Sequence, residues 1–269
     1  MPPPLRIPGL FLALGLAACH EPRPVAPLET GVPAPPAATS VASAPSAPPA
    51  PSLTASVAPP APPVAPSFLF RTASRQNDFR LDMAKPCESG DPGCAGPASL
   101  HVLTKEGAEI QRIDLDLAWI STGDDGAPLV NTAELYERQG TINTGDFDFD
   151  GREDFAVQVD QSGPYGGPTF AVFLRDPKED RFTRSEALSR LTQETLGFFQ
   201  VDTAKKRIRT MEKSGCCIHV SEEHEVVRGT PRVTFRRTEN AMDDDVVITE
   251  ERLVGGRWQK KTHRETAQP

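Results

Sequence analysis

The chain has 269 residues, of which 38% are hydrophobic, and its formal net charge is −8. This length allows one or two soluble domains of ordinary size. The acidic balance gives no electrostatic footprint for phosphate backbones, so we expect no nucleic-acid partner.

The N-terminus has the features of a bacterial export signal. Arg6 precedes an apolar run, residues 7–18, that is too short to span a bilayer and ends in small residues before Cys19. The signal peptide is therefore expected over residues 1–18. The sequence LAAC resembles a bacterial lipobox, which implies that Cys19 is lipidated; an ordinary signal peptide is the alternative. His20 follows the cysteine, and resemblance to proteobacterial lipoproteins implies the outer membrane, facing the periplasm.

The next segment, residues 19–66, reads as a linker after the lipidated cysteine. From residue 20 onward it is almost entirely Pro, Ala, Ser, Thr and Val, without an apolar periodicity that could build a core. This composition predicts a disordered chain rich in polyproline II, which extends by about 3 Å per residue. We interpret it as a passive spacer that lets a folded domain reach into the peptidoglycan layer.

Residues 67–269 form one candidate domain, long enough to bury a core. Short segments in which apolar and polar residues alternate predict strands. They lack the alternation with helices that a parallel sheet needs, so we expect a mainly β domain with antiparallel sheets, like a sandwich or a propeller. The expected strands are residues 68–70, 100–103, 110–117, 155–159, 170–174, 208–211, 220–227, 233–237, 246–253 and 258–263.

One short helix is expected to connect these strands. Thr183 and Glu186 have the spacing of a T-x-x-E capping box, which predicts the helix start. Leu188 and Leu191 would share its apolar face, and Gly197 would stop it.

The segment GDFDFDGRED, residues 145–154, has the ligand spacing of a calcium loop. Carboxylates at its alternate positions can converge on one cation, and Gly151 allows the sharp turn between them. An EF-hand is excluded, because Val157 stands at the twelfth place and a strand pattern follows. The expected ligands are Asp146, Asp148, Asp150, Asp154 and the main-chain carbonyl of Arg152.

This segment resembles the calcium loops of FG-GAP and VCBS-type repeats, which occur in extracellular β-proteins. In those repeats the ninth-place aspartate, here Asp154, closes the ligand shell. The resemblance implies bound Ca²⁺ in a structural role, which pins a β-turn; a bare acidic turn is the alternative.

Four cysteines beyond Cys19 make an even set, as expected in an oxidising compartment. Cys87 and Cys94 flank a turn-rich loop that could close on itself, which leaves Cys216 and Cys217 bonded to each other or reduced. A bond between adjacent cysteines is uncommon, and cross-pairing would join the loop to the later sheet, so three connectivities remain open. The two adjacent cysteines with His219 and His224 give only a weak zinc or copper signal, because no second CxxC pair is present.

A polar loop, Ser162-Gly163-Pro164-Tyr165 followed by two glycines, lies between two expected strands and predicts a sharp hairpin tip. It resembles the SGxY loop of the periplasmic inhibitors of invertebrate-type lysozyme, which enters the active-site cleft of the lysozyme. Together with the lipobox, the acidic segment and SGCCIH, it also resembles the calcium-binding immunity lipoproteins of Xanthomonas-type bacterial-killing type IV secretion systems. The likeness covers residues 143–224, about a third of the chain.

These resemblances imply a non-enzymatic inhibitor or immunity lipoprotein. Its partner would be a lysozyme-like peptidoglycan hydrolase or secreted effector, contacted by Ser162, Gly163, Pro164 and Tyr165. Calcium would stiffen the hairpin and lower the ordering cost of binding. One alternative is a surface adhesion or envelope-scaffold lipoprotein.

The other alternative is a cell-wall glycan hydrolase that uses a His and Glu cluster. Neighbours on one strand point to opposite faces, which disfavours the paired carboxylates that such an enzyme needs. The residues in question are His219, Glu222, Glu223 and His224.

Overall fold

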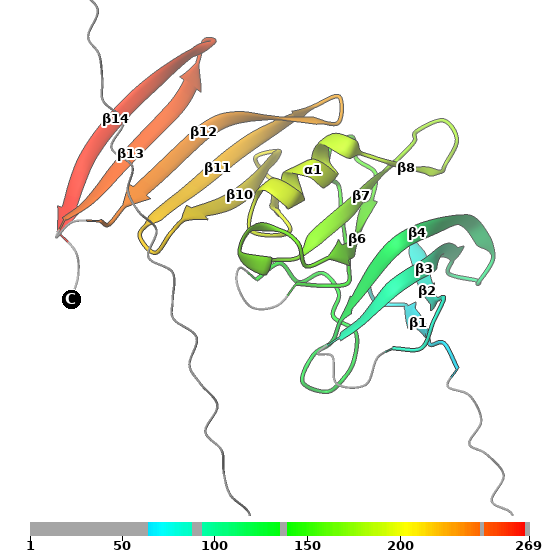
Figure 1. Ribbon diagram of the computed structural model, residues 1–269. Coiled ribbons are helices and arrows are strands. Elements are labelled where there is room, and N and C mark those ends of the chain that lie inside the picture. The colour runs from blue at the N-terminus through cyan, green and yellow to red at the C-terminus, as the bar shows by residue number, and fades with distance from the viewer. Residues whose placement is uncertain (1–63, 88–92, 135–138, 243–244, 267–269) are drawn as a thin grey trace, which may run out of the picture. The chain divides into compact units, whose positions relative to one another are not determined.

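The computed structural model describes residues 64–87, 93–134, 139–242 and 245–266, all within the unit Pro59–Pro269. Over these residues the chain forms three antiparallel sheets and a single α-helix (Figure 1). The expected mainly β class with one connecting helix is confirmed. The predicted signal peptide, Cys19 and nearly all of the predicted linker lie outside the described residues.

The first sheet has four strands in sequence order. They are β1 (Ser67–Phe70), β2 (Asn77–Met83), β3 (Gly93–Thr104) and β4 (Glu109–Ser121). Period-two alternation sends one set of apolar side chains, including Phe79, Leu81, Leu100 and Ile120, into a buried cluster. The first sheet is therefore polar on one face and apolar on the other.

The second sheet also has four strands in sequence order and is buried on both faces. They are β5 (Ile142–Gly145), β6 (Asp154–Asp160), β7 (Thr169–Arg175) and β8 (Phe182–Arg184). Phe155 and Val157 of β6 pack in the first cluster, where the rings of Phe155 and Phe79 lie 5.0 Å apart. Ala156, between them, packs in a second cluster on the other side. The first two sheets thus form a sandwich.

The second cluster joins the second sheet to the helix α1 (Glu186–Glu194) and to a third sheet. Phe170 and Val172 of β7 meet Leu188 of α1 and Ile208 there. The third sheet is a meander of six strands in consecutive order. They are β9 (Gln200–Asp202), β10 (Arg207–Ser214), β11 (Ile218–Val227), β12 (Thr230–Asn240), β13 (Asp245–Val254) and β14 (Arg257–Thr266).

The start of α1 differs from the expected capping box. Thr183 belongs to β8, where it pairs with Leu174, so it is unavailable as the N-cap. Ser185 takes that place, and its hydroxyl accepts a hydrogen bond of 3.3 Å from the N–H of Leu188. The expected apolar face is confirmed, and the helix ends at Glu194 with Thr195 as its C-cap, two residues before Gly197. Among the described residues, no helix has both the length and the apolarity needed to cross a membrane.

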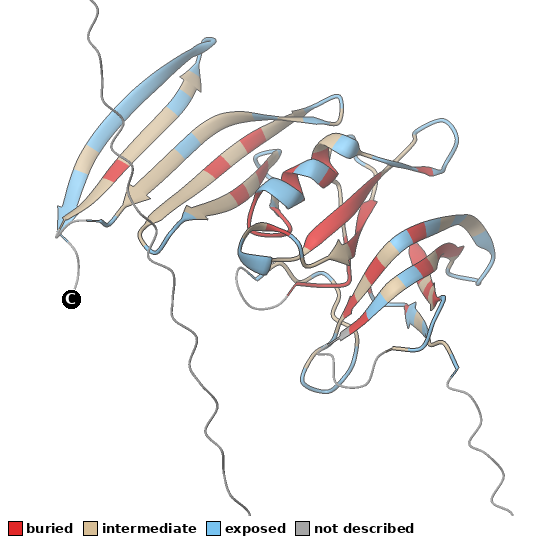
Figure 2. Cartoon of the chain, in the orientation of Figure 1, coloured by how far each residue is buried: buried red, intermediate tan, exposed pale blue. Residues whose placement is uncertain are grey.

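The far strands of the third sheet bury few apolar side chains. Figure 2 shows exposed residues along β14, and Ile248 is the buried apolar residue of β13. In place of a core, charges of alternating sign stand opposite one another across four strands. This charge row consists of Glu222, Arg236, Glu251 and Lys260.

Candidate functional site

The acidic loop, residues 146–154, joins β5 to β6 and is anchored by an aromatic side chain. Phe147 is 1% exposed and makes edge contacts with the rings of Phe198 and Phe199. Gly151 has φ +91°, a conformation that L side chains rarely adopt. The buried ring and the glycine turn hold the alternating aspartates around one point.

The loop brings together three of the four predicted aspartates. Asp146, Asp148 and Asp154 each offer one carboxylate oxygen within 4.8 Å of the others. Asp150 is exposed, and its Oδ1 instead accepts a hydrogen bond of 2.8 Å from the N–H of Arg152. The group is thus smaller than the ligand set expected from spacing.

The hydrogen bonds of these three aspartates leave one buried carboxylate oxygen without a partner. Asp154 accepts from the N–H of Phe147 at 2.8 Å and from that of Arg175 at 2.9 Å. Asp146 accepts from the N–H of Gly151 through Oδ2, whereas its buried Oδ1 has no hydrogen-bond partner. A buried carboxylate oxygen without a partner is costly, and a hard cation with oxygen ligands would satisfy it. The residues therefore fit Ca²⁺.

The raised pKa values of two of these aspartates also favour a bound cation. Burial raises the pKa of Asp154 to about 7, against the two N–H donors that lower it, and Asp148 and Asp146 add repulsion. The pKa of Asp148 is also raised, by burial first and then by the negative charge of Asp150. Negative charge is crowded in this loop, and a divalent cation would relieve it.

The contact loop, residues 161–168, joins β6 to β7 at the other end of β6 and contains a 3₁₀ turn, Pro164–Gly166. The N–H of Gly163 donates to the carbonyl of Gly167 at 3.0 Å. A Cβ on Gly163 would lie 2.9 Å from that same carbonyl, so the tight loop requires glycine there.

The side chain of Tyr165 projects from this loop into solvent, but hydrogen bonds hold its hydroxyl group. Its residue is 60% exposed and has φ +58°. The phenol oxygen accepts from the N–H of Gly215 at 2.8 Å and donates to the carbonyl of Lys213 at 3.4 Å. Nζ of Lys213 lies 4.4 Å from the ring centroid. The β10–β11 hairpin therefore supports this ring, a contact that the sequence did not reveal.

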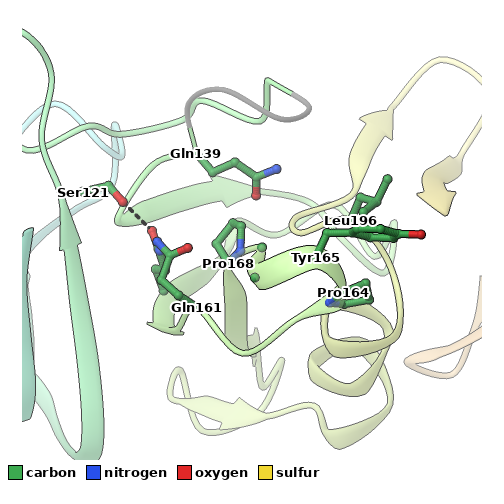
Figure 3. Close-up of a pocket in the computed structure, with 10 residues that line it drawn as sticks. Ser121, Gln139, Gln161, Pro164, Tyr165, Pro168 and Leu196 are labelled. Atoms are coloured by element: carbon green, nitrogen blue, oxygen red, sulfur yellow. Dashed lines mark hydrogen bonds between the residues drawn. The ribbon is translucent and has the colours of Figure 1, made fainter. Parts of the chain in front are cut away.

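Ser162 and Tyr165 line different hollows. Ser162 borders a hollow that it shares with Asp160 and Arg184. Pro164 and Tyr165 border a pocket of about 230 Å³ whose other walls include Gln139 (Figure 3). The side chains of the loop thus face two separate surfaces. The pocket is lined by Ser121, Gln139, Gln158, Gln161, Pro164, Tyr165, Gly166, Gly167, Pro168 and Leu196.

The acidic loop and the contact loop do not touch, because β6 separates them. Seven residues at about 3.3 Å each place the loops roughly 20 Å apart. A cation in the acidic loop would act on the strands that carry the contact loop rather than on its tip. The stiffening of the hairpin by calcium that we expect from the sequence would therefore act along β6.

The cysteines form two local disulfides, Cys87–Cys94 and Cys216–Cys217. With both sulfurs of the second pair bonded to each other, that pair has no thiolate for zinc or copper.

The histidine and glutamate cluster is split between the two faces of β11. Glu222 and His224 are buried in a hollow beside α1, whereas His219 and Glu223 occupy positions of the opposite face. Glu222 is paired with Arg236 at 2.6 Å. This arrangement does not present two free carboxylates across a cleft.

Comparison with known proteins bears on the fold. No protein-family model matches the chain, and no curated protein matches it. A solved structure, described as that of a Xanthomonas type IV secretion system related protein, is similar with a TM-score of 0.58 and 21% sequence identity. The match covers 73% of this chain and 93% of that one. At this identity the likeness establishes a shared fold.

Proposed function

We propose that this chain is a lipoprotein of the bacterial cell envelope that binds and inhibits a lysozyme-like peptidoglycan hydrolase. The main support for this proposal is the state of Tyr165. This residue is 60% exposed, while the N–H of Gly215 donates a hydrogen bond to its hydroxyl oxygen. An aromatic ring that is exposed and already held loses little conformational freedom on binding. Such rings commonly dominate the energy of an interface.

The chemistry of the contact loop suits an acidic cleft. Lysozyme-like sites are elongated and carry catalytic carboxylates. Tyr165 offers an exposed aromatic ring, and Lys213 places an ammonium group over it. Ser162, Gly163 and Pro164 complete the loop and would contact the cleft walls. The fold likeness to a Xanthomonas type IV secretion system related protein is compatible with a role connected with such a system.

Calcium and a lipid anchor complete the proposal. The acidic loop would hold Ca²⁺ through Asp146, Asp148 and Asp154, and the ion would supply the positive charge that these carboxylates lack. By fixing the main chain at Arg175, Asp154 ties this site to the end of β7, so the ion would stabilise the sheet that carries the contact loop. Cys19 would anchor the chain in the outer membrane, facing the periplasm.

The proposal gives the chain no catalytic role. The test is inhibition of a panel of purified lysozymes and peptidoglycan-cleaving effectors by the full chain with Cys19→Ser, which removes the acylation site. Stoichiometric inhibition of at least one enzyme is expected, together with no cleavage of peptidoglycan by the chain itself. Neither binding nor inhibition across the panel would instead favour a calcium-stabilised adhesion or scaffold lipoprotein.

A further inference from the structure

The turn between β10 and β11, residues 215–217 and hereafter the cysteine turn, holds the Cys216–Cys217 disulfide beside Tyr165. Gly215, which donates to the phenol oxygen at 2.8 Å, immediately precedes the bonded pair. Lys213, whose carbonyl accepts from the phenol and whose Nζ lies over the ring, is two residues earlier. Both hydrogen bonds of the phenol and the cation contact of the ring therefore come from this hairpin.

Tyr165 needs that support. Its φ of +58° lies in the left-handed region, which is uncommon for a residue with a bulky side chain. Such conformations persist where the surrounding structure fixes them. Hydrogen bonds within the contact loop fix the backbone on one side, and the cysteine turn holds the side chain on the other.

The disulfide restricts the cysteine turn itself. A bond between adjacent residues closes a small ring through the peptide that joins them, which limits the conformations of the turn. Gly215 has φ +64°, so this turn depends on a backbone conformation that most residues avoid. Cys216 is exposed and Cys217 is half-buried, which leaves the bond within reach of a small thiol.

We propose that the Cys216–Cys217 disulfide positions Tyr165 for binding and makes that binding sensitive to dithiol reductants; the second part rests on the proposed function. A dithiol reductant would break the S–S bond and transfer two hydrogens to the sulfurs, becoming a disulfide itself. The freed turn would no longer hold the N–H of Gly215 against the phenol. Tyr165 is thus a contact residue, and Gly215, Cys216 and Cys217 are positioning residues.

The test compares two paired substitutions in the full chain. Cys216→Ser with Cys217→Ser opens the cysteine turn, and Cys87→Ser with Cys94→Ser is the matched control that opens the other disulfide. The first readout is the NMR signal of the Tyr165 ring, identified by its loss in Tyr165→Phe; the chain has only two tyrosines. The second is the inhibition constant for a hydrolase found in the panel above.

Opening the cysteine turn should shift the Tyr165 ring signal and weaken inhibition by about fivefold or more. The control pair should change neither, although its Tm falls. In a Tyr165→Phe background, which already lacks the hydroxyl, opening the turn should change inhibition by less than about twofold. Dithiothreitol added to the control variant should reproduce the effect of opening the cysteine turn.

The two readouts separate this inference from the function on which it partly rests. An unchanged ring signal overturns the positioning role, whatever happens to inhibition. A shifted signal with unchanged inhibition overturns the link from the turn to binding. A shifted signal in a chain that inhibits none of the enzymes supports the positioning role and overturns the proposed function.

Discussion

At the scale of single residues, Phe147 links the hydrophobic core to the acidic loop. It lies between Asp146 and Asp148, and its ring is buried against Phe198 and Phe199. Asp146 and Asp148 are half-buried on either side of this ring, and their carboxylates converge with that of Asp154. The buried ring thus fixes the part of the loop that carries the proposed calcium site.

The first prediction is that Ca²⁺ raises the Tm of the wild-type chain and that Asp148→Ala abolishes most of this rise. A ligand present at 100 times its Kd stabilises the folded state by about 2.7 kcal/mol. For a domain of this size the gain corresponds to roughly 5 to 10 °C. Scanning calorimetry in calcium and in EDTA measures it, with Asp116→Ala, an exposed aspartate on β4, as the control. Equal melting curves for wild type in the two buffers would refute the site.

The second prediction distinguishes Tyr165 from Ser162 in the contact loop. Tyr165→Ala should weaken inhibition of the target by at least roughly thirtyfold, which corresponds to about 2 kcal/mol. Its cost in folding stability should be only about 1 kcal/mol, because the contacts it loses are at the surface. Ser162→Ala, which faces the other hollow, should cost less in both respects. Inhibition constants and urea unfolding measure the two effects, and unfolding caused by Tyr165→Ala would show that the loop is scaffold.

The third prediction concerns His224, which lies 2% exposed beside α1. Burial lowers its pKa, whereas the nearby Glu222 acts in the opposite direction and Arg236 adds to the lowering. The unfolded chain therefore binds a proton at a higher pH than the folded one, so stability is present above the usual histidine pKa of about 6.5 and falls as the pH drops below it. His224 should therefore contribute a lower Tm at about pH 5.5 than at about pH 7.5, a difference that adds to the opposite contribution of Asp154, whose pKa burial raises to about 7 in wild type and variants alike.

His224→Gln should reduce this difference, because it removes the group that takes up the proton on unfolding. His219→Gln, on the opposite face of β11, is the matched control and should leave the difference unchanged. Calorimetry of the three proteins in EDTA keeps the acidic loop free of metal in every sample. An identical pH dependence in wild type and His224→Gln would contradict the assignment.

At the scale of the elements, the fourth prediction tests which residue begins α1. Ser185→Ala should lower the free energy of unfolding by about 1 kcal/mol, because it removes the acceptor for the N–H of Leu188. Thr183→Ala, in the exposed part of β8, should have a smaller effect. Chemical denaturation of both variants compares them directly, and a larger loss for Thr183→Ala would restore the T-x-x-E capping box.

Strands were predictable from the sequence where a periodic apolar pattern was strong, and were missed where charge obscured it. All ten predicted strand segments fall within observed strands. β2 was missed because Asp78, Arg80 and Asp82 alternate with its buried apolar residues and lower its hydrophobicity. β5, β8 and β9 are three or four residues long and contain one apolar residue each, whereas β1, which is equally short, contains three.

The site was predictable only where its residues are neighbours in sequence. The aspartate spacing identified the acidic loop, although the exposed position of Asp150 depends on how the chain turns. The support of Tyr165 by Gly215 joins residues fifty positions apart, and no local pattern encodes it. Ser162 and Tyr165 are close in sequence, yet the 3₁₀ turn directs them to different hollows.

At the scale of the whole molecule, one sheet serves two hydrophobic clusters. β6 and β7 contribute alternate residues to the first cluster and to the second, as Phe155 and Ala156 illustrate. Neither cluster can lose this sheet without exposing the other, so the sandwich and the helix layer should unfold together. The acidic loop joins β5 to β6, and Asp154 holds the end of β7, which places a bound cation where it would stabilise both clusters.

The fifth prediction concerns the anchor of the chain. Wild type should fractionate with membranes and incorporate labelled fatty acid, whereas Cys19→Ser should do neither. One acyl chain binds a bilayer only marginally, but the several chains of a bacterial lipoprotein hold firmly. Cys87→Ser, which removes a cysteine of a local disulfide, is the control and should remain in the membrane fraction. A Cys19→Ser variant that is still acylated would refute the anchor.

The charge row of the third sheet has a consequence for how these strands find one another during folding. Where a sheet buries few apolar side chains, as here with Ile248 in β13, burial specifies the pairing register only weakly. A slip of two residues along β12 keeps each side chain on its face but separates Arg236 from Glu222 and Glu251, its partners at 2.6 and 3.8 Å. We therefore expect the alternating signs to favour the observed register over slipped ones during folding, and the charged side chains of β14 to disfavour the pairing of another strand at its edge.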